Sequence, residues 1–566
     1  MKFIITSILL IITTTLAISQ NMPTEGVPTD IIEACKHSLI DKTTLEPIIW
    51  EDGVAHVKGK VYNYDKNNYG GKQPKAVVTV GNILGNNNVI SQFSFVVMDD
   101  GTFEFDVPMV CNHMPVTVCL FNVFTSYIIV SAGETSFVHV DAMETIRHKE
   151  NPDEANYSAA GYWLGANADL NNAFQNAGID EKKYYGLLSM EDARIFTTPA
   201  DELKENIFEE YNKLTPLIEK AEISPRAKEY LQLCLINSLA YQIGIIAGFH
   251  RSDVSYYDYL IDNRELLFSK KRYYVMNFDA YNFTKNIIDV QHNLRWVEIC
   301  KNTFDELLSN GTISISDTAF VNYDLNYMSQ NISPFGYNSC IHNIYKSAFE
   351  NLLPQKREEI VTSIAKGVLD NYYQSYLDYS TIYDAKRVLS NNELISEDLF
   401  SRLTALDEPY FLSYFRKENA KLEKELAKTY YGPIQENFDE CDKLLSRLLE
   451  PYRGKVVLLE VWGLGCGPCI LASREMHEDK ITLAKEGIVF LHVATEGTPS
   501  DMPGEHIKLS YQDMEIFKNK YTQAVPQFLF FDKKGHLIKN VVGYGEGLHQ
   551  NFFRPQLIEL NSVEGK

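Results

Sequence analysis

The spacing of hydrophobic residues changes twice along this chain, and these changes limit the fold more than any other feature. From about residue 54 to 140, short apolar runs alternate with turn signals such as Asp100-Gly101, a pattern typical of antiparallel strands. From about 156 to 443, apolar residues recur at helical spacing. From about 438 to 560, strand-like and helical segments alternate. One fold class does not produce all three patterns, so we expect a multidomain protein.

The predicted parts are an N-terminal antiparallel β-sandwich at 20–145, a central all-α helical region at 150–435 and a C-terminal α/β domain at 436–566. A length of 566 residues agrees with several domains. In the last part, the expected order is strand, helix, strand, helix, a two-stranded hairpin and a final helix. This order predicts a mixed central sheet with helices on both faces. The sequence assigns no role to the central helices.

Residues 1–19 are predicted to be a cleavable signal peptide. An apolar run follows Lys2, and the small residues Ala17 and Ser19 come after that run. A membrane anchor is the alternative, but the apolar run is short for a membrane span. We therefore expect an exported, periplasmic protein that does not span a membrane after cleavage of the signal, in a compartment where disulfides persist.

Charge and cysteine content narrow the function further. The formal net charge of -22 and the lack of a dense basic run argue against a nucleic-acid partner. Nine cysteines are present. Cys111 and Cys119 flank a short segment and form either a disulfide that closes a hairpin or two unpaired buried thiols, because spacing does not decide connectivity.

The segment Cys466-Gly-Pro-Cys469, a CxxC pair, carries the strongest chemical signal. It follows a buried strand predicted at 456–462 and begins a helix. The start of a helix has unpaired N–H groups and a positive dipole end, which stabilise a thiolate. Pro468 suits the first helical turn because its missing N–H loses no hydrogen bond there. The pair is therefore expected to exchange disulfides, with Cys466 the more exposed sulfur.

A zinc site and a purely structural disulfide are the two alternatives for this pair. A structural zinc ion needs about four ligands, and only Cys441 and His492 stand near in the sequence. We therefore predict no metal. A ring closed through Gly-Pro is tight, which favours a bond that opens and closes over a permanent cross-link.

The segment YRGKVVLLEVWGLGCGPC resembles the active-site strand and helix of exported thioredoxin-like disulfide reductases, of the TlpA-like family. The resemblance covers about the last quarter of the chain. The matching residues, in order, are Tyr452, Gly454, Lys455, Val456, Val457, Glu460, Trp462, Cys466 and Cys469. It implies a thioredoxin-like fold and a thiol–disulfide oxidoreductase with a redox-active centre that needs no cofactor.

The resemblance also implies a role for individual residues. Cys466 is the expected nucleophile, Cys469 the resolving thiol and Glu460 a proton relay to Cys469. Glu460 lies within an apolar strand, so we expect it to be buried and its pKa to be raised by desolvation. Trp462 is expected to pack beneath the active-site helix, or to be simple core.

A second match implies a substrate clamp. Pro526 corresponds to a cis proline that faces the cysteine pair, and the backbone of Val525 would pair with an extended substrate. Two positions depart from the family pattern: Gly465 stands where a tryptophan is usual, and Gln527 follows the proline. Both departures would alter the substrate groove. His492 is expected to be a hydrogen-bonded core residue, and a surface loop is expected for His506.

The expected function is an exported thiol–disulfide oxidoreductase, in the reducing direction, that acts on protein disulfides. Its electrons would come from a membrane or periplasmic dithiol donor. One alternative is an exported binding or scaffold protein with a redox-inactive thioredoxin-like domain, which the Gly465 departure favours. The other is a dithiol protein that handles Cu(I). CxxC spacing alone does not fix the direction of electron flow.

Overall fold

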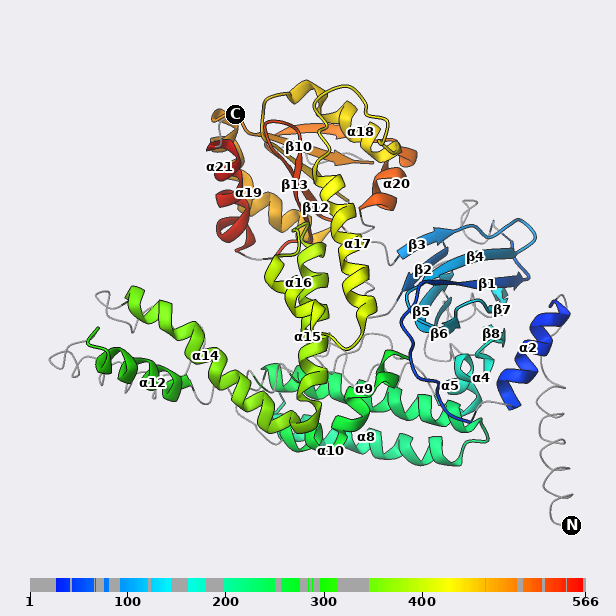
Figure 1. Ribbon diagram of the computed structural model, residues 1–566. Coiled ribbons are helices and arrows are strands. Elements are labelled where there is room, and N and C mark those ends of the chain that lie inside the picture. The colour runs from blue at the N-terminus through cyan, green and yellow to red at the C-terminus, as the bar shows by residue number, and fades with distance from the viewer. Residues whose placement is uncertain are drawn as a thin grey trace, which may run out of the picture. The chain divides into compact units, whose positions relative to one another are not determined.

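The computed structural model (Figure 1) describes most of the chain between Val27 and Ser562. The described ranges are 27–40, 43–65, 67, 76–80, 92–120, 124–143, 161–179, 198–249, 256–274, 284, 288, 296–312, 346–463, 465–495, 502–521, 525–545 and 547–562. The predicted signal peptide lies outside them. Two compact units divide the chain, one formed by 1–76 and 95–379 and the other by 77–94 and 380–566. The helices between 380 and 427 thus group with the C-terminal domain, whereas the predicted boundary stood at 435/436.

The β-rich region contains two four-stranded sheets, in the orders β4-β1-β7-β8 and β3-β2-β5-β6. The strands are β1 (Gly53–Tyr62), β2 (Ala76–Val80), β3 (Gln92–Phe95), β4 (Thr102–Met109), β5 (His113–Leu120), β6 (Phe124–Ser131), β7 (Thr135–Asp141) and β8 (Gly161–Gly165). Side chains of β1 alternate between buried and more exposed positions, as a strand with one covered face requires. However, β1 pairs with β7 in parallel, so the first sheet is mixed and not purely antiparallel as predicted.

No disulfide joins the two cysteines of the predicted hairpin. Cys111 is buried, and its Sγ lies 3.0 Å from the carbonyl oxygen of His113. Cys119 is partly exposed. The disulfide alternative is therefore wrong, and of the two thiols only Cys111 is fully buried.

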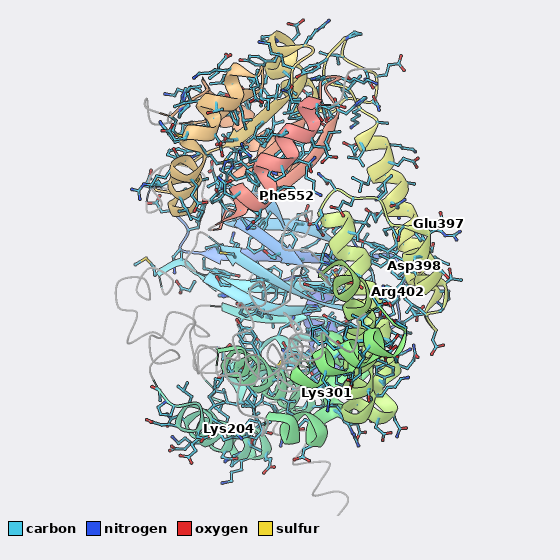
Figure 2. All side chains as sticks on the ribbon, turned by 90° about the vertical axis from the view of Figure 1, so that its left-hand side faces the viewer. Lys204, Lys301, Glu397, Asp398, Arg402 and Phe552 are labelled. Carbon is cyan, nitrogen blue, oxygen red and sulfur yellow. A yellow bond between two sulfur atoms is a disulfide. The ribbon has the colours of Figure 1, made fainter. Side chains whose placement is uncertain are left out.

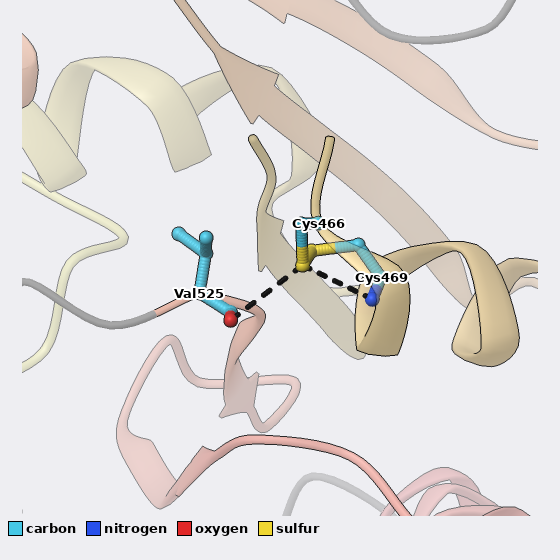
Figure 3. Close-up of a disulfide and its surroundings, with 3 residues drawn as sticks. All are labelled: Cys466, Cys469 and Val525. Atoms are coloured by element: carbon cyan, nitrogen blue, oxygen red, sulfur yellow. Dashed lines mark hydrogen bonds between the residues drawn. A yellow bond between two sulfur atoms is a disulfide. The ribbon is translucent and has the colours of Figure 1, made fainter. Parts of the chain in front are cut away.

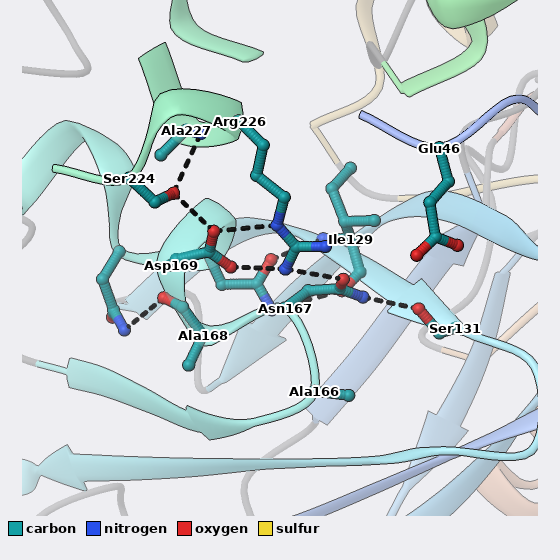
Figure 4. A network of polar contacts seen from close by, with 12 residues as sticks. Glu46, Ile129, Ser131, Ala166, Asn167, Ala168, Asp169, Ser224, Arg226 and Ala227 are labelled. Atoms are coloured by element: carbon teal, nitrogen blue, oxygen red, sulfur yellow. Dashed lines mark hydrogen bonds and ion pairs between the residues drawn. The ribbon is translucent and has the colours of Figure 1, made fainter. Parts of the chain in front are cut away.

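A buried ion pair connects the β-rich region to the helices that follow it (Figure 4). Arg226, at the start of α9 (Pro225–Phe249), places Nη2 at 2.5 Å and Nε at 2.8 Å from the two carboxylate oxygens of Asp169. The Ser224 hydroxyl donates to the same carboxylate at 2.6 Å. Asn167 donates to Ser131 Oγ of β6 at 2.7 Å. These contacts satisfy the buried charges and fix the helix start against the sheet.

The remaining elements of this unit are helical. They are α2 (Thr29–Ile40), α4 (Ala168–Asn171), α5 (Ala173–Asn176), α8 (Ala200–Lys220), α10 (Tyr256–Phe268), η3 (Lys270–Tyr274), α12 (Trp296–Ser309), α14 (Lys346–Leu369) and η6 (Asp370–Tyr372). Apolar side chains of α8, α9, α10 and α14 form one core. Pro225 is the first residue of α9, and Pro199 is the N-cap of α8, one residue before that helix begins.

A helical arm opens the second unit. It comprises the end of α15 (Tyr373–Ser390), α16 (Glu397–Thr404) and α17 (Pro409–Leu426). On α16, Leu399 and Leu403 are buried while Glu397, Asp398 and Arg402 are exposed, which Figure 2 shows gathered along this helix. This one-sided pattern anchors the helix through its apolar face.

The C-terminal domain has a five-stranded sheet in the order β11-β10-β9-β12-β13. Its elements are α18 (Glu440–Leu449), η7 (Glu450–Tyr452), β9 (Val457–Val461), α19 (Gly467–Lys485), β10 (Val489–Ala494), β11 (Glu505–Lys508), α20 (Tyr511–Lys520), β12 (Gln527–Phe531), β13 (Leu537–Val542), η8 (His549–Phe553) and α21 (Arg554–Ser562). Strand β9 is parallel to β10 and antiparallel to β12. Helices α18 and α20 cover one face and α19 and α21 the other (Figure 1), so the predicted mixed sheet is present.

A buried carboxylate attaches the arm to this domain. Asp442 on α18 is fully buried and lies 2.7 Å from Lys428 Nζ and 2.5 Å from Lys520 Nζ, and it accepts a hydrogen bond from Tyr430 at 2.9 Å. Burial alone would raise the pKa of Asp442, but the hydrogen bonds and charges of the two lysines lower it. A separate ion pair joins Glu393, between α15 and α16, to Lys539 of β13.

Within the described ranges, no helix is both long enough and apolar enough to cross a membrane.

Candidate active site

Cys466 and Cys469 form a disulfide at the start of α19 (Figure 3). Strand β9 is buried along its whole length and ends at Val461, and the chain then turns at Gly463 and Gly465 into the helix. The two Cα atoms are 5.3 Å apart. Cys466 is partly exposed, whereas Cys469 is fully buried. The two sulfurs therefore differ in access as predicted.

The position of Cys466 favours a thiolate after reduction. It is the N-cap residue of α19, and its Sγ accepts a hydrogen bond from the backbone N–H of Cys469 at 3.1 Å. The helix dipole adds a positive partial charge at the same point. Both effects stabilise negative charge on this sulfur, which is what a nucleophilic cysteine requires.

The segment before β12 faces the exposed sulfur. The peptide bond between Val525 and Pro526 is cis, as the resemblance implied. The Val525 carbonyl oxygen lies 3.6 Å from Cys466 Sγ (Figure 3). Val525 is partly exposed and Pro526 is buried. Backbone of this segment is therefore available beside the nucleophile.

A small apolar cluster surrounds the buried sulfur. Trp462, Ala494 and Met502 pack with Cys469, and Cys466 and Val525 contact the edge of this group. Trp462 is 6% exposed, so it supports the pair from below and offers little surface to a substrate. We call Trp462, Cys469, Ala494 and Met502 the Cys469 cluster.

Glu460 lies in β9 and is buried, and the side chains of Lys480 and His492 contact it. Its Oε1 is 2.7 Å from Lys480 Nζ, and its Oε2 is 3.2 Å from His492 Nδ1. All three side chains are at most 1% exposed. Lys480 comes from α19, and His492 is the residue of β10 that is paired with Glu460 across the sheet. The carboxylate therefore sits in a buried ion triad on the side of the sheet that α19 covers.

The direction of the Glu460 pKa shift is opposite to the prediction. Desolvation by burial raises the pKa, but the charges of Lys480 and His492 outweigh it and lower the pKa to about 2. The prediction considered burial alone, because the partners come from two other elements. Glu460 is thus ionised at neutral pH, and a role as proton relay remains a prediction.

The two departures from the family pattern have different structural reasons. Gly465 is exposed and has a φ of 75°, a left-handed conformation that a tryptophan would adopt only with strain. Gln527 is fully buried, and its Nε2 donates to Asn540 Oδ1 of β13 at 2.9 Å. Gln527 therefore does not line the substrate groove, whereas the backbone at Gly465 does reach the surface beside Cys466.

The two histidines differ from each other as expected. His492 is a core residue, and its Nε2 lies 3.0 Å from the carbonyl oxygen of Pro503. His506 is exposed, but it lies in edge strand β11 and not in a loop. Its Nε2 is 2.9 Å from the carbonyl oxygen of Met502.

Sequence reasoning missed Lys480 and Met502. Lys480 had a signal, because the buried residues of α19 are Cys469, Ala472, Met476, Lys480 and Leu483, at steps of three and four. A lysine in that apolar stripe requires a buried anion, and Glu460 is the one. Met502 follows a segment outside the described residues and carried no sequence signal.

Metal ligation finds no support among the side chains that the structure describes. Within them, no group of three or more His, Cys, Asp or Glu residues is placed to hold an ion.

Comparisons with known proteins give a limited likeness. No protein-family model and no curated protein matches the chain. Among solved structures, a protein assigned as a thioredoxin from Neisseria meningitidis matches with 19% identity, 20% coverage of this chain, 81% of its own and a TM-score of 0.18. A protein assigned as the thiol:disulfide interchange protein DsbE from Chlorobium tepidum matches with 17% identity, 20% coverage of this chain, 84% of its own and a TM-score of 0.14.

Because these TM-scores are low, the fold of the C-terminal domain is described from its own sheet and helices. The C-terminal sheet is mixed and has helices on both faces, and the cysteine pair stands where β9 leads into α19, as the sequence predicted. The part of the chain from α18 to α21 therefore has the mixed sheet with helices on both faces that the sequence predicted.

Proposed function

We propose that the protein is an exported, periplasmic thiol–disulfide oxidoreductase of the TlpA-like kind that reduces disulfides in other proteins. The observation that carries this proposal is the pair of sulfurs at the start of α19: one is accessible and hydrogen-bonded by a helix N–H, and the other is buried within bonding distance of it. This arrangement supplies a nucleophile and an internal thiol that can displace it.

The reaction proceeds in two exchanges. The Cys466 thiolate attacks one sulfur of a substrate disulfide, that disulfide breaks, and the first substrate sulfur leaves with the electron pair and takes up a proton. The Cys469 thiol loses its proton and attacks Cys466 Sγ, which releases the second substrate sulfur. The substrate gains two electrons, and the Cys466–Cys469 disulfide forms. A dithiol donor in the periplasm or the membrane would then restore the reduced pair.

Substrate binding would use the backbone beside the nucleophile. The carbonyl oxygen of Val525 points to the Cys466 sulfur and can accept a hydrogen bond from an extended substrate segment. The left-handed turn at Gly465 leaves no side chain over that approach: a Cβ built at this position meets no atom within 4 Å. Both features favour a polypeptide substrate over a small thiol.

The test is disulfide reduction by the full chain. Reduced protein is mixed with insulin, a protein with accessible disulfides, and three proteins are compared: wild type, Cys466→Ser and Cys469→Ser. Turnover is expected for the wild type alone, and Cys469→Ser is expected to trap a mixed disulfide through Cys466. Cys441→Ser is the matched control, because that thiol is buried and free, so it should turn over like the wild type.

Equal inactivity of the wild type and both active-site variants would overturn the proposal. The remaining description would then be an exported protein with a redox-inactive thioredoxin-like domain.

A further inference from the structure

Two histidines hold successive carbonyl groups of the segment 502–504. Nε2 of His506 lies 2.9 Å from the carbonyl oxygen of Met502, and Nε2 of His492 lies 3.0 Å from that of Pro503. A carbonyl oxygen only accepts hydrogen bonds, so each ring must carry a proton on Nε2. The two rings lie 5.0 Å apart. One ring comes from the buried strand β10 and the other from the edge strand β11, at paired positions of the two strands, so two neighbouring side chains contact the segment.

The next residue shows how closely this segment approaches the sheet. Gly504 has a φ of 132°, and a Cβ built on it would lie 2.7 Å from His492 Nε2 and 2.7 Å from the carbonyl oxygen of Phe490. Any larger residue would push the backbone away from both groups. Glycine therefore permits the contact that His492 makes with Pro503.

The same segment contributes one side chain to the cluster that contains the resolving cysteine. Met502 is 5% exposed and belongs to the Cys469 cluster. Its thioether side chain shares that cluster with Cys469 and Trp462, next to the partly exposed Cys466. His506 contacts the backbone of Met502, and His492 contacts the backbone of the next residue, Pro503.

We propose that His492 and His506 are positioning residues that keep Met502 packed against Cys469, so that Cys466 is the only sulfur the resolving thiol can reach. This inference rests on the proposed function. In the mixed disulfide, the Cys469 thiolate attacks Cys466 Sγ, the bond between Cys466 and the substrate breaks, and the substrate sulfur leaves with the electron pair and takes a proton from water. Without the shield, Cys469 also meets thiols and disulfides from solution.

Glu460 also helps to position this segment, because it contacts His492. Its Oε2 is 3.2 Å from His492 Nδ1, while Lys480 holds its other oxygen at 2.7 Å. The buried carboxylate thereby orients the imidazole so that Nε2 faces Pro503. Glu460 thus acts on Cys469 through the position of a ring and of a backbone segment.

The experiment measures which sulfur reacts. The reduced full-length protein is treated with iodoacetamide, and the initial labelling rates of Cys466 and Cys469 are obtained by mass spectrometry. His506→Ala and Met502→Ala are compared with wild type. Each variant removes one of the side chains that the inference invokes. His506 is exposed, so the fold should tolerate its replacement. Lys508→Ala is the matched control, because it is exposed on the same strand.

We expect the ratio of Cys469 to Cys466 labelling to be low in the wild type and in Lys508→Ala. It should rise about tenfold or more in both His506→Ala and Met502→Ala, because thiol labelling follows access. The double variant should add little to either single change, since both act on one contact. A melting curve of each variant shows that the labelled protein is folded.

Two results would overturn the inference. One is a wild type in which Cys469 is labelled as fast as Cys466; the other is a ratio that stays unchanged in both folded variants. Neither readout needs turnover of a disulfide substrate. A wild type that labels selectively but reduces no insulin would therefore contradict the proposed function while leaving the shield intact.

Discussion

Lys480 Nζ and Glu460 Oε1 lie 2.7 Å apart, and each side chain is 1% exposed. A buried ion pair of this kind stabilises a fold little by itself, because both charges lose their hydration. Removing one partner, however, leaves an uncompensated charge beneath the active-site helix. The stability of the C-terminal domain therefore depends on Lys480 and Glu460 together.

Replacing Lys480 with Met should destabilise the C-terminal domain by about 3–5 kcal/mol, the usual cost of breaking a buried pair from one side. Amide hydrogen exchange of β9 measures this loss locally. Lys485→Met, at the exposed end of the same helix, should stay within about 0.5 kcal/mol of wild type. The double variant Lys480→Met/Glu460→Leu should recover most of the loss; a double variant as unstable as the single one would contradict the assignment.

Acid should act differently on wild type and Lys480→Met. In the wild type the folded-state pKa of Glu460 is about 2, below the ordinary value of about 4.3. Its contribution to stability is therefore complete above the ordinary value and is lost as the pH falls through 2, and it amounts to about 3 kcal/mol. In Lys480→Met the charge of Lys480 is absent, so the folded-state pKa of Glu460 should be lowered much less. The difference in stability between the two proteins should narrow between pH 5 and pH 2, as urea unfolding at several pH values would show; a constant difference would contradict the pairing.

Three buried thiols should be inert in the folded protein. Desolvation by burial is the main cause that raises the pKa of Cys35 to about 11 and those of Cys111 and Cys441 to about 12. Thiolate is the reactive form, so in protein whose Cys466–Cys469 disulfide has been reduced, alkylation at pH 8 should be far slower at these sites than at Cys466. Mass spectrometry of protein alkylated before and after unfolding checks this. Rapid labelling of any of the three in the folded state would show that burial does not protect it.

The arm should fold together with the C-terminal domain as one cooperative unit. A fragment that begins at residue 436 lacks Lys428 and Tyr430, which hold the buried carboxylate of Asp442. It should be less stable by about 3 kcal/mol or more than a fragment that begins at residue 380. Asp442→Asn should cost the longer fragment more stability than the shorter one, in which Lys520 but not Lys428 or Tyr430 still contacts the carboxylate. Thermal melts of the four proteins make the comparison, and equal melting temperatures of the two unsubstituted fragments would contradict it.

Local sequence signals predicted the frame of the C-terminal domain well. Strands β9, β10 and β12 are continuous apolar runs, and the cysteine pair marks the start of α19, so their existence and order followed from the chain alone. Strand β11 did not follow, because its residues Glu505–Lys508 are mostly exposed and lack an apolar alternation. An edge strand is defined by its neighbour more than by its own sequence.

Pairing between distant elements was the part that the sequence did not reveal. The burial of Glu460 followed from its apolar neighbours, but its ionisation depends on Lys480 and His492, which only the fold brings to it. The parallel pairing of β1 with β7 was missed for the same reason. The cis peptide bond before Pro526 was available only through the family resemblance, since a trans proline also suits the start of a strand.

The short segment between the arm and the C-terminal domain is attached to the body of that domain. Tyr430 N–H bonds to the carbonyl oxygen of Gly535, and Thr429 forms a β-bridge with His536, so the link is hydrogen-bonded to the turn between β12 and β13. No flexible linker therefore separates α17 from β12, the strand that begins beside Cys466. The position of α17 is consequently coupled through the backbone to the turn between β12 and β13.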